Sequence, residues 1–340
     1  MRLVIDGFGK FLGRKGETLV VREEGRIVQR LQPSQLEQVI ISGSGCVSTD
    51  ALELLASHGV DVLLVNFRGE VLARLSPPEM RTVSTRREQY EAYRDERGIH
   101  IAEAIVEAKM RNQAAVLGTL AKKRVDTAPG TASVLHEASN EIRRLADQVS
   151  SVKGSSIDLA RPSLMNLEGR AAELYWSALA QIFGKEWRFT RRSGRYATDP
   201  VNAMLNYGYG ILLGETWRAV YYAGLDPYGG FLHADKPGKP SMALDLMEEF
   251  RPHLIDRCVV KMVTKRAVTP EDFEVVDGVC QMKDHSRRLL LQEVLQKLEA
   301  ELHVGELKLT WGGMILYQAR KLAKFLRGEL PQYEGFWQRW

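Results

Sequence analysis

The chain has 340 residues, which is enough for two domains or for one large domain with a substantial core. Apolar residues make up 44% of it and charged residues 26%, and the net charge of +4 is compatible with nucleic acid without establishing it. Three widely spaced cysteines argue against a disulfide scaffold or a structural zinc site. Charged residues interrupt the start of the chain, unlike a signal peptide, and no apolar run approaches the length of a membrane span. We therefore expect a cytoplasmic protein with no membrane partner.

The first part of the chain, residues 1–76, is predicted to form a small β-rich domain with one helix. Short runs of branched residues bounded by glycines indicate strands. The predicted strands are Arg2–Ile5, Thr18–Val21, Arg26–Leu31, Gln38–Ile41, Val60–Val65 and Val71–Leu75. Ser48–His58 begins with a capping residue and stops at Gly59, as a helix does. The glycines from Gly7 to Gly13 nearly match a dinucleotide fingerprint, but the last spacing is wrong, so we interpret them as turns.

A composition break at Ser76-Pro77-Pro78 separates this domain from a larger, all-α domain, residues 77–340, and the whole chain is predicted to be α+β. Apolar residues at helical spacing predict its helices. They are Ile99–Lys123, Ala132–Ser150, Leu167–Phe183, Asn202–Ala219, Ser241–Phe250, Ser286–Val304 and Met314–Arg327. Lys185–Thr198 is polar and strongly basic and is predicted to be a loop. The first 80 residues carry nine Lys or Arg and ten Asp or Glu, so a surface for polyanions should lie mainly after them.

Glu168 is the first candidate for chemistry. It is predicted at the start of the helix Leu167–Phe183, on the same face as Ala171, Ala172 and Tyr175. A carboxylate on a buried face needs a metal, a cation or several donors, because an unpaired buried charge is very unfavourable. The alternative is a carboxylate at a helix N-terminus that complements the helix dipole.

A second group of candidates surrounds His233. Ser241, with Pro240 just before it, suits the start of a helix on which Asp245 and Glu248 are three residues apart and share one face. A histidine and two carboxylates can supply nitrogen and oxygen ligands to Mg²⁺ or Mn²⁺. The alternative is a loop histidine beside a solvated acidic helix.

Together these stretches resemble one family, the CRISPR-associated integrase that inserts new spacers. The matching stretches, in the family's order, are Leu167-Glu168-Gly169-Arg170, Asp199 to Tyr209 (DPVNAMLNYGY), His233 with Lys239-Pro240-Ser241, and Asp245 to Pro252 (DLMEEFRP). The resemblance covers essentially the whole chain. It implies a β-rich dimerisation domain followed by a helical catalytic domain.

The resemblance also implies an active site. Its metal ligands are Glu168, His233 and Glu248, which would hold Mg²⁺ or Mn²⁺, and Asp245 lies beside the metal and contributes to activity. Glu248 is preferred to Glu249 because it shares the helix face of Asp245, whereas Glu249 would point about 100° away. The implied reaction is transesterification, in which the 3′-hydroxyl of a short prespacer DNA attacks a phosphodiester of the CRISPR array. With water as the acceptor, the same site would cut DNA.

Basic residues near these motifs are candidates for contact with double-stranded and branched DNA. Lys236, Lys239 and Arg251 flank the predicted site, and Arg188, Arg191 and Arg192 lie in the basic loop, where the aromatic residues Trp187, Phe189 and Tyr196 are interleaved with them. A solvated, flexible loop is the alternative.

The family resemblance further implies a homodimer and a small ferredoxin-like companion subunit of CRISPR adaptation. Three rival functions stay open: a stand-alone nuclease that acts on branched DNA, a non-catalytic DNA-binding scaffold, and a glycoside hydrolase that uses Glu168 and Asp245. The basic loop and the nearby histidine disfavour the last of these.

Overall fold

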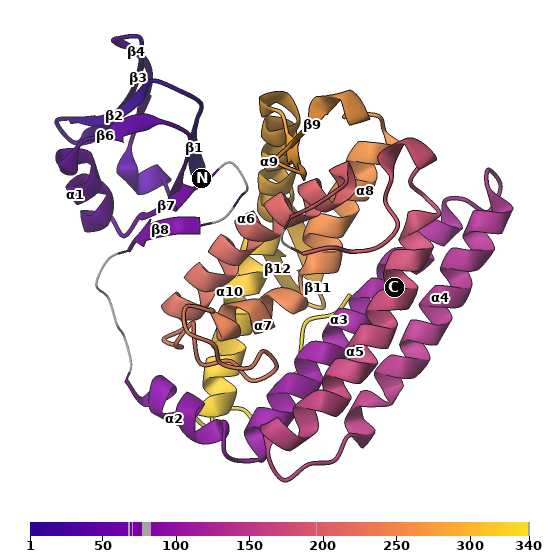
Figure 1. The fold of residues 1–340 in the computed structure, drawn as a ribbon. Helices are drawn as coiled ribbons and strands as arrows, with labels where there is room; N and C mark the ends of the chain where they lie inside the picture. Colours follow the sequence, from indigo (N-terminus) through magenta and orange to yellow (C-terminus); the bar gives the residue numbers. More distant parts are fainter. Residues whose placement is uncertain (67–68, 70, 77–82, 195, 339–340) are drawn as a thin grey trace. The chain divides into compact units, whose positions relative to one another are not determined.

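The computed structural model describes residues 1–340 except 67–68, 70, 77–82, 195 and 339–340. The chain divides into two compact units, Met1–Glu79 and Met80–Trp340 (Figure 1). A strand-rich first unit followed by a mainly helical second unit confirms the predicted α+β class. The first unit ends close to the predicted break, and Pro77 and Pro78 themselves lie outside the described residues.

Within its described residues, the first unit contains two four-stranded sheets and one α-helix. One sheet has the order β1 (Arg2–Asp6), β5 (Gln38–Ser42), β7 (Asp61–Val65) and β8 (Val71–Leu75), with β8 antiparallel to its neighbour. The other has the order β4 (Arg26–Leu31), β3 (Thr18–Glu23), β2 (Lys10–Lys15) and β6 (Gly45–Val47). The helix α1 (Thr49–Ser57) starts at Ser48, whose hydroxyl accepts from the Ala51 amide at 3.2 Å. Branched side chains such as Ile5, Val39 and Val62 meet leucines of α1 in the core.

The glycine-rich segment after β1 is a turn, as predicted, and no dinucleotide loop. Gly7 and Gly9 have φ values of 101° and 73°, in the region that favours glycine, and the chain then enters β2. Gly13 lies inside that strand. Strand β2 was not predicted, because the charged residues and the glycine of β2 hide the alternation that is typical of a strand.

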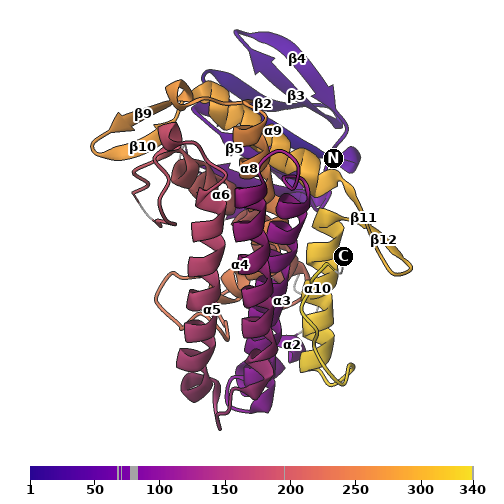
Figure 2. The ribbon, with the colours of Figure 1, turned by 90° about the vertical axis from the view of Figure 1, so that its right-hand side faces the viewer.

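Three long helices form one side of the second unit. They are α3 (Glu96–Lys122), α4 (Pro129–Asp147) and α5 (Ile157–Ala180). The shorter helix α2 (Ser84–Ala92) precedes them in the chain. Helix α3 packs along both α4 and α5, and the three run side by side (Figure 2). Asp95 caps α3 by accepting from the Arg97 amide at 2.8 Å, and Pro129 starts α4, where its missing N–H is no loss.

Helix α5 starts ten residues before the predicted helix. It begins at Ile157 and continues through Pro162, although a proline in a helix interior removes a hydrogen bond and ordinarily ends or kinks the helix. Buried side chains on both sides of the proline, at Ile157, Ala160 and Leu164, anchor this stretch. Glu168 therefore lies well inside α5, and the interpretation that it complements a helix N-terminus is wrong.

Further helices of the second unit follow α5 in the chain. They are α6 (Pro200–Tyr222), α7 (Ser241–Glu248), the π-helical turn η4 (Pro252–Asp256), α8 (Arg257–Thr264), α9 (Asp284–Glu299) and α10 (Trp311–Leu326). Short 3₁₀ turns are η1 (Pro33–Gln35) in the first unit and η2 (Val149–Ser151), η3 (Lys185–Trp187) and η5 (Pro270–Asp272) in the second. Within the described residues, no helix is long and apolar enough to cross a bilayer.

Two hairpins add strands to the unit that was predicted to be all-α. They pair β9 (Phe273–Val276) with β10 (Val279–Met282), and β11 (Glu301–Val304) with β12 (Leu307–Thr310). The predicted helix Ser286–Val304 is correspondingly shorter, because α9 ends at Glu299 and the chain turns into β11. The segment after α10 docks on the helices, with Tyr333 and Phe336 buried.

Candidate active site

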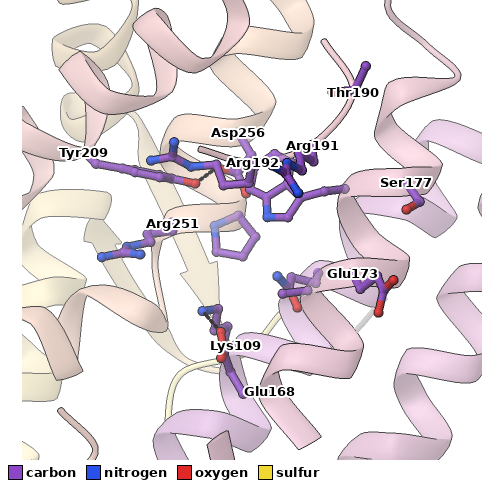
Figure 3. A pocket seen from close by; sticks show the side chains of 14 residues that line it. Lys109, Glu168, Glu173, Ser177, Thr190, Arg191, Arg192, Tyr209, Arg251 and Asp256 are labelled. Carbon is purple, nitrogen blue, oxygen red and sulfur yellow. Dashed lines mark hydrogen bonds and ion pairs between the residues drawn. The ribbon is translucent and has the colours of Figure 1, made fainter. Parts of the chain in front are cut away.

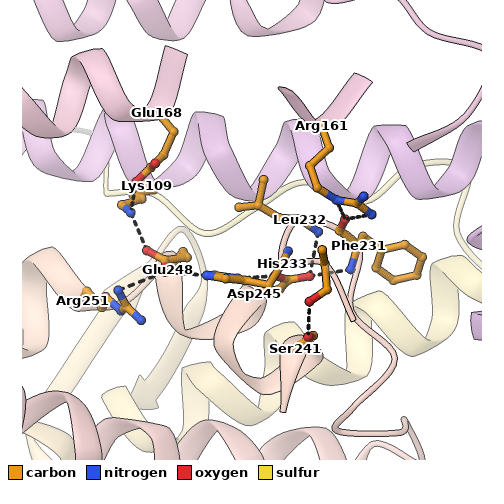
Figure 4. A network of polar contacts seen from close by, with 11 residues as sticks. Lys109, Arg161, Glu168, Phe231, Leu232, His233, Ser241, Asp245, Glu248 and Arg251 are labelled. Atoms are coloured by element: carbon orange, nitrogen blue, oxygen red, sulfur yellow. Dashed lines mark hydrogen bonds and ion pairs between the residues drawn. The ribbon is translucent and has the colours of Figure 1, made fainter. Parts of the chain in front are cut away.

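Glu168 contacts a lysine, Lys109, that is not among the predicted site residues. Lys109, from α3, donates a hydrogen bond to Oε1 of Glu168 on α5. The same ammonium lies 2.6 Å from Oε2 of Glu248 on α7. Three helices that are distant in sequence therefore bring two of the predicted ligands to one point, with a cation between them (Figure 4).

Asp245 is a buried acid that organises the loop before α7. Its carboxylate accepts hydrogen bonds from the backbone amides of Phe231, Leu232 and His233, at 2.6, 2.9 and 2.9 Å. It also lies 2.7 Å from Nδ1 of the His233 ring. Since both carboxylate oxygens are used in this way, Asp245 orients the histidine and its loop, a role typical of residues behind a metal ligand.

Gly230 allows this loop to approach α7. A Cβ atom at this position would lie 2.5 Å from the Cβ of Ser241 and 3.0 Å from Oδ2 of Asp245. From the other side, the Arg161 guanidinium on α5 donates two hydrogen bonds to the Phe231 carbonyl, at 3.1 and 3.0 Å. The backbone that carries His233 is thus held from both α5 and α7.

His233 faces Glu248. With Nδ1 on Asp245, its other nitrogen, Nε2, lies 3.9 Å from Oε1 of Glu248. The acids of α7 are buried, with Asp245 0% and Glu248 2% exposed. The alternative of a histidine beside a solvated acidic helix is therefore wrong.

Glu248 is held ionised by its neighbours. Burial alone would raise the pKa of its carboxyl, but the Arg251 and Lys109 cations outweigh burial and lower the pKa to about 2. Arg251 lies 3.0 Å from Oε1 of Glu248. A buried carboxylate that stays charged is suited to binding a cation.

Glu249, the adjacent acid, serves a different purpose. Its carboxylate accepts from the Tyr333 hydroxyl at 2.5 Å, the Phe336 amide at 2.7 Å and the Gln318 amide group at 3.1 Å. It therefore fastens the segment after α10 to the end of α7. Neighbouring acids on one helix end thus point to different partners, as the 100° step between successive residues requires.

A cavity of about 520 Å³ opens beside Glu168 (Figure 3). Its lining combines four cations with three acidic and two aromatic side chains. The lining residues used below are Lys109, Glu168, Arg191, Arg192, Tyr209 and Arg251. The Arg251 and Arg192 guanidinium groups lie 4.7 and 5.2 Å from the centre of the Tyr209 ring. Such a lining suits an anion with a flat group, as a nucleotide has.

The stretch from Asp199 to Tyr209, on α6, holds the basic loop in place. Asp199 caps α6 by accepting from the Asn202 amide at 2.9 Å. The Asn202 side chain accepts from Arg192 at 3.0 Å and donates to the Arg191 carbonyl at 2.9 Å. Asn206 accepts from Arg192 at 2.6 Å and donates to the Gly194 carbonyl at 2.7 Å. The loop is therefore fastened to α6, and its residues Arg191 and Arg192 line the cavity.

Other predicted DNA contacts lie elsewhere. Lys236 and Lys239 follow His233 in an exposed turn, where the Lys239 amide donates to the Lys236 carbonyl at 3.0 Å, and neither lines the cavity. Arg188 is exposed and is not part of the lining either.

Two of the three aromatic residues of the basic loop are buried and cannot stack on bases, contrary to the interpretation from sequence. Trp187 and Phe189 are 4% and 7% exposed, and they pack against the rings of Phe273 and Phe183. Only Tyr196 of this set is exposed. The loop is therefore anchored by its aromatic side chains, which also rules out a fully solvated, flexible segment.

The predicted ligands fit a divalent cation by their chemistry. Two carboxylates and an imidazole nitrogen suit Mg²⁺ or Mn²⁺. As they stand, no three acidic, histidine or cysteine side chains of the described residues are grouped closely enough to hold a metal. The Lys109 ammonium occupies the space between Glu168 and Glu248, so a positive charge already lies between these two acids.

Comparison with known proteins decides the family. The family model described as CRISPR associated protein Cas1 matches residues 3–296. The chain belongs to the Cas1 family. It is also 46% identical to the CRISPR-associated endonuclease Cas1 1 of Archaeoglobus fulgidus, over 100% of both chains. The predicted family is thereby confirmed.

Solved structures place the Cas1 fold in a wider group. A casposase bound to integration product matches 98% of this chain and 92% of its own, with a TM-score of 0.83 and 26% identity. A chain of a Cas6-RT-Cas1–Cas2 complex matches 100% of this chain and 36% of its own, with a TM-score of 0.81 and 20% identity. The second likeness concerns the fold alone.

Proposed function

We propose that this Cas1 chain is a divalent-metal-dependent DNA integrase that inserts prespacer DNA into a CRISPR array. One observation carries the proposal: Glu168 and Glu248 meet at the Lys109 ammonium, and His233 Nε2 lies 3.9 Å from Glu248, beside a cavity lined by arginines. Membership of a family of endonucleases supports it, and so does the likeness to a casposase whose solved structure holds an integration product.

Glu168, His233 Nε2 and Glu248 would hold Mg²⁺ or Mn²⁺. When bound, the metal would supply positive charge that makes a hydroxyl more acidic and stabilises charge on the phosphoryl group. Asp245 keeps Nδ1 of His233 engaged and so presents Nε2 to the metal. Arg251 keeps Glu248 ionised and also lines the cavity where a phosphate would enter.

The reaction needs no nucleophile from the protein. The 3′-hydroxyl oxygen of the prespacer forms a bond to phosphorus, the bond to the 3′-oxygen of the target strand breaks, and that oxygen gains a proton as the attacking hydroxyl loses one. Tyr175 lies near Glu168 in sequence but is fully buried, and its hydroxyl donates to Asp256 at 2.9 Å. Its engagement excludes it as an attacking group.

The proposed partners follow from the family. We infer a homodimer formed through the first unit, a small ferredoxin-like companion subunit, and double-stranded or branched DNA as the substrate. The apolar residues exposed on the first unit support self-association. The arginine-lined cavity supports contact with DNA phosphates.

The test is strand transfer of a labelled short duplex into a plasmid that carries leader and repeat, with the companion subunit and Mg²⁺ or Mn²⁺. We expect Glu168→Ala and His233→Ala each to lower the joining rate about 100-fold or more, because each removes a proposed ligand of the metal that would act at the reacting phosphate. Glu137→Ala and His136→Ala, which change the same residue types on the exposed face of α4, should keep the wild-type rate.

Two results would contradict the proposal. Joining that survives both substitutions would mean that the active site lies elsewhere. Cleavage of branched DNA without joining, even with the companion subunit present, would favour the stand-alone nuclease.

A further inference from the structure

Lys109 is a buried cation between two predicted metal ligands. It belongs to α3, whereas Glu168 and Glu248 belong to α5 and α7. Its side chain is 11% exposed, and it makes ion pairs with both acids. A lysine is seldom buried to this extent unless it is paired, so the two carboxylates account for its position.

The charges of this cluster balance without a metal. Glu168 and Glu248 carry two negative charges, and Lys109 and Arg251 carry two positive charges. A divalent cation on the same two carboxylates would leave the cluster with a surplus of two positive charges. Because like charges in a buried site repel strongly, the ammonium and the metal cannot share the space between the acids.

We propose that Lys109 is the exchangeable counter-ion of this site: it neutralises Glu168 and Glu248 in the metal-free protein and leaves them when a divalent cation binds. The inference rests on the proposed metal site, but it does not depend on which reaction the site performs.

The cavity offers the displaced ammonium a place. Lys109 lines it together with Arg191, Arg192 and Arg251 (Figure 3). A lysine side chain has four rotatable carbon bonds, so its ammonium can turn from the carboxylates towards this space without a change in α3. There it would add to the positive charge that a DNA phosphate meets, and metal loading would thereby prepare the cavity for an anion.

A fixed structural ion pair is the alternative role. In that role, Lys109 would stabilise the protein equally with and without metal, and its removal would not improve metal binding. An exchangeable counter-ion competes with the metal, so its removal must tighten metal binding while it destabilises only the metal-free form. The two roles therefore predict opposite results for one variant.

The experiment titrates Mn²⁺ into the purified full chain and follows free Mn²⁺ by electron paramagnetic resonance, with thermal unfolding measured in EDTA and in saturating Mn²⁺. We expect Lys109→Met to tighten Mn²⁺ binding by about tenfold. In EDTA its Tm should fall by about 4 °C or more, because two buried acids lose a partner. In saturating Mn²⁺, the difference in Tm between Lys109→Met and the wild type should be smaller than in EDTA.

Control variants separate the charge of Lys109 from its packing. Lys109→Arg keeps the cation and should stay within about threefold of the wild-type affinity, which also provides a test if Lys109→Met does not fold. Lys122→Met, at the exposed end of the same helix, should behave as wild type. Glu168→Gln should weaken Mn²⁺ binding in either background.

The two proposals fail in distinguishable ways. If the wild type does not bind Mn²⁺, or if Glu168→Gln binds as well as the wild type, the metal site itself is wrong and this inference falls with it. If the wild type binds through Glu168 but Lys109→Met binds equally or more weakly, the metal site stands and the exchange role of Lys109 is overturned.

Discussion

Asp245 and Glu248 are separated by one turn of α7 and have different tasks. Asp245 accepts three backbone amide hydrogens and contacts the His233 ring, so it shapes the loop before α7. Glu248 instead faces Lys109 and Arg251, which keep it ionised. Spacing alone placed both acids on one face, but their hydrogen-bond partners assign one of them to orientation and the other to the cation.

Asp256 is a buried acid whose ionisation should affect stability. It accepts from the hydroxyls of Tyr175 and Tyr209, at 2.9 and 2.6 Å. Burial raises the pKa of Asp256 to about 6, although the two hydroxyls counter part of this rise. Because the pKa in the folded protein exceeds that of the unfolded chain, Asp256 contributes most to stability at low pH, and this contribution is lost as the pH rises through about 6.

The pH dependence of unfolding checks this. Relative to Asp256→Asn, which does not titrate, we expect the wild type to gain about 2 kcal/mol in the free energy of unfolding between pH 7.5 and pH 4.5. Urea unfolding of both proteins at the two pH values measures the difference. If the free energies of unfolding of the wild type and Asp256→Asn differ by the same amount at both pH values, the pKa of Asp256 is close to that of a free aspartate.

Glu168, His233, Asp245 and Glu248 were found from their sequence context, whereas Lys109 was not. A lysine among apolar residues of an amphipathic helix looks the same whether it reaches solvent or turns inward, because its long side chain can do either. Its partners lie on α5 and α7, far away in the sequence, and no local pattern records them. The proposed metal ligands could be named from motifs, but Lys109, the cation between Glu168 and Glu248, could be identified only from the fold.

At the scale of secondary structure, α6 explains why the basic loop has a fixed shape. Asn202 and Asn206 lie on one face of α6 and bind both the backbone and the arginine side chain of the loop. The hairpin β9–β10 adds a further contact, because the Cys280 amide donates to the Ala197 carbonyl at 2.7 Å. The cavity arginines are thus positioned before any ligand arrives.

Loosening this attachment should weaken DNA binding. We expect Asn206→Ala to lower the affinity for duplex DNA several-fold, because Arg192 loses a partner and the Gly194 carbonyl of the loop loses the hydrogen bond that it accepts from Asn206. If Arg192 contacts a phosphate, the slope of log affinity against log salt should also fall by about 1. Fluorescence anisotropy over a range of salt concentrations measures both quantities.

Asn140→Ala on α4 is the matched control. The described contact of the Asn140 side chain is with His136 on the same helix. Unchanged affinity and slope for Asn206→Ala would separate the basic loop from DNA binding.

Long helices and their order could be predicted from apolar spacing, but their limits and the short strands could not. Pro162 hides the first turns of α5, whose stability comes from packing on α3. The strands of both hairpins in the second unit are four residues long, too short for alternation to stand out, and they are defined by pairing with each other. The interpretation of Trp187 and Phe189 as DNA contacts was wrong, because a basic sequence does not indicate whether its aromatic side chains are buried.

At the scale of the whole molecule, the two units carry different surfaces. The first is near neutral, and its two sheets end in strands with exposed apolar side chains: Val28 of β4 is 55% exposed and Leu72 of β8 is 67% exposed. Exposed edge strands of this kind favour association with a partner. The second unit holds the candidate active site and most of the basic residues.

The homodimer can be tested through these strands. We expect the wild type to sediment as a dimer, and Val28→Asp or Leu72→Asp to shift it towards the monomer, because a charge would be buried at the contact. Analytical ultracentrifugation at several concentrations measures this shift. Leu159→Asp, which changes an equally exposed leucine on α5, should leave the dimer intact. A monomeric wild type would contradict the proposal.

Glu249 has a consequence for how this protein is made. Its partners Tyr333 and Phe336 follow it by 84 and 87 residues. At about 5 to 20 residues per second, synthesis of that interval takes roughly 4 to 17 seconds, during which α7 exists without the segment that fastens its end. A nascent chain halted before residue 336 would therefore leave the helix that carries Asp245 and Glu248 incompletely anchored.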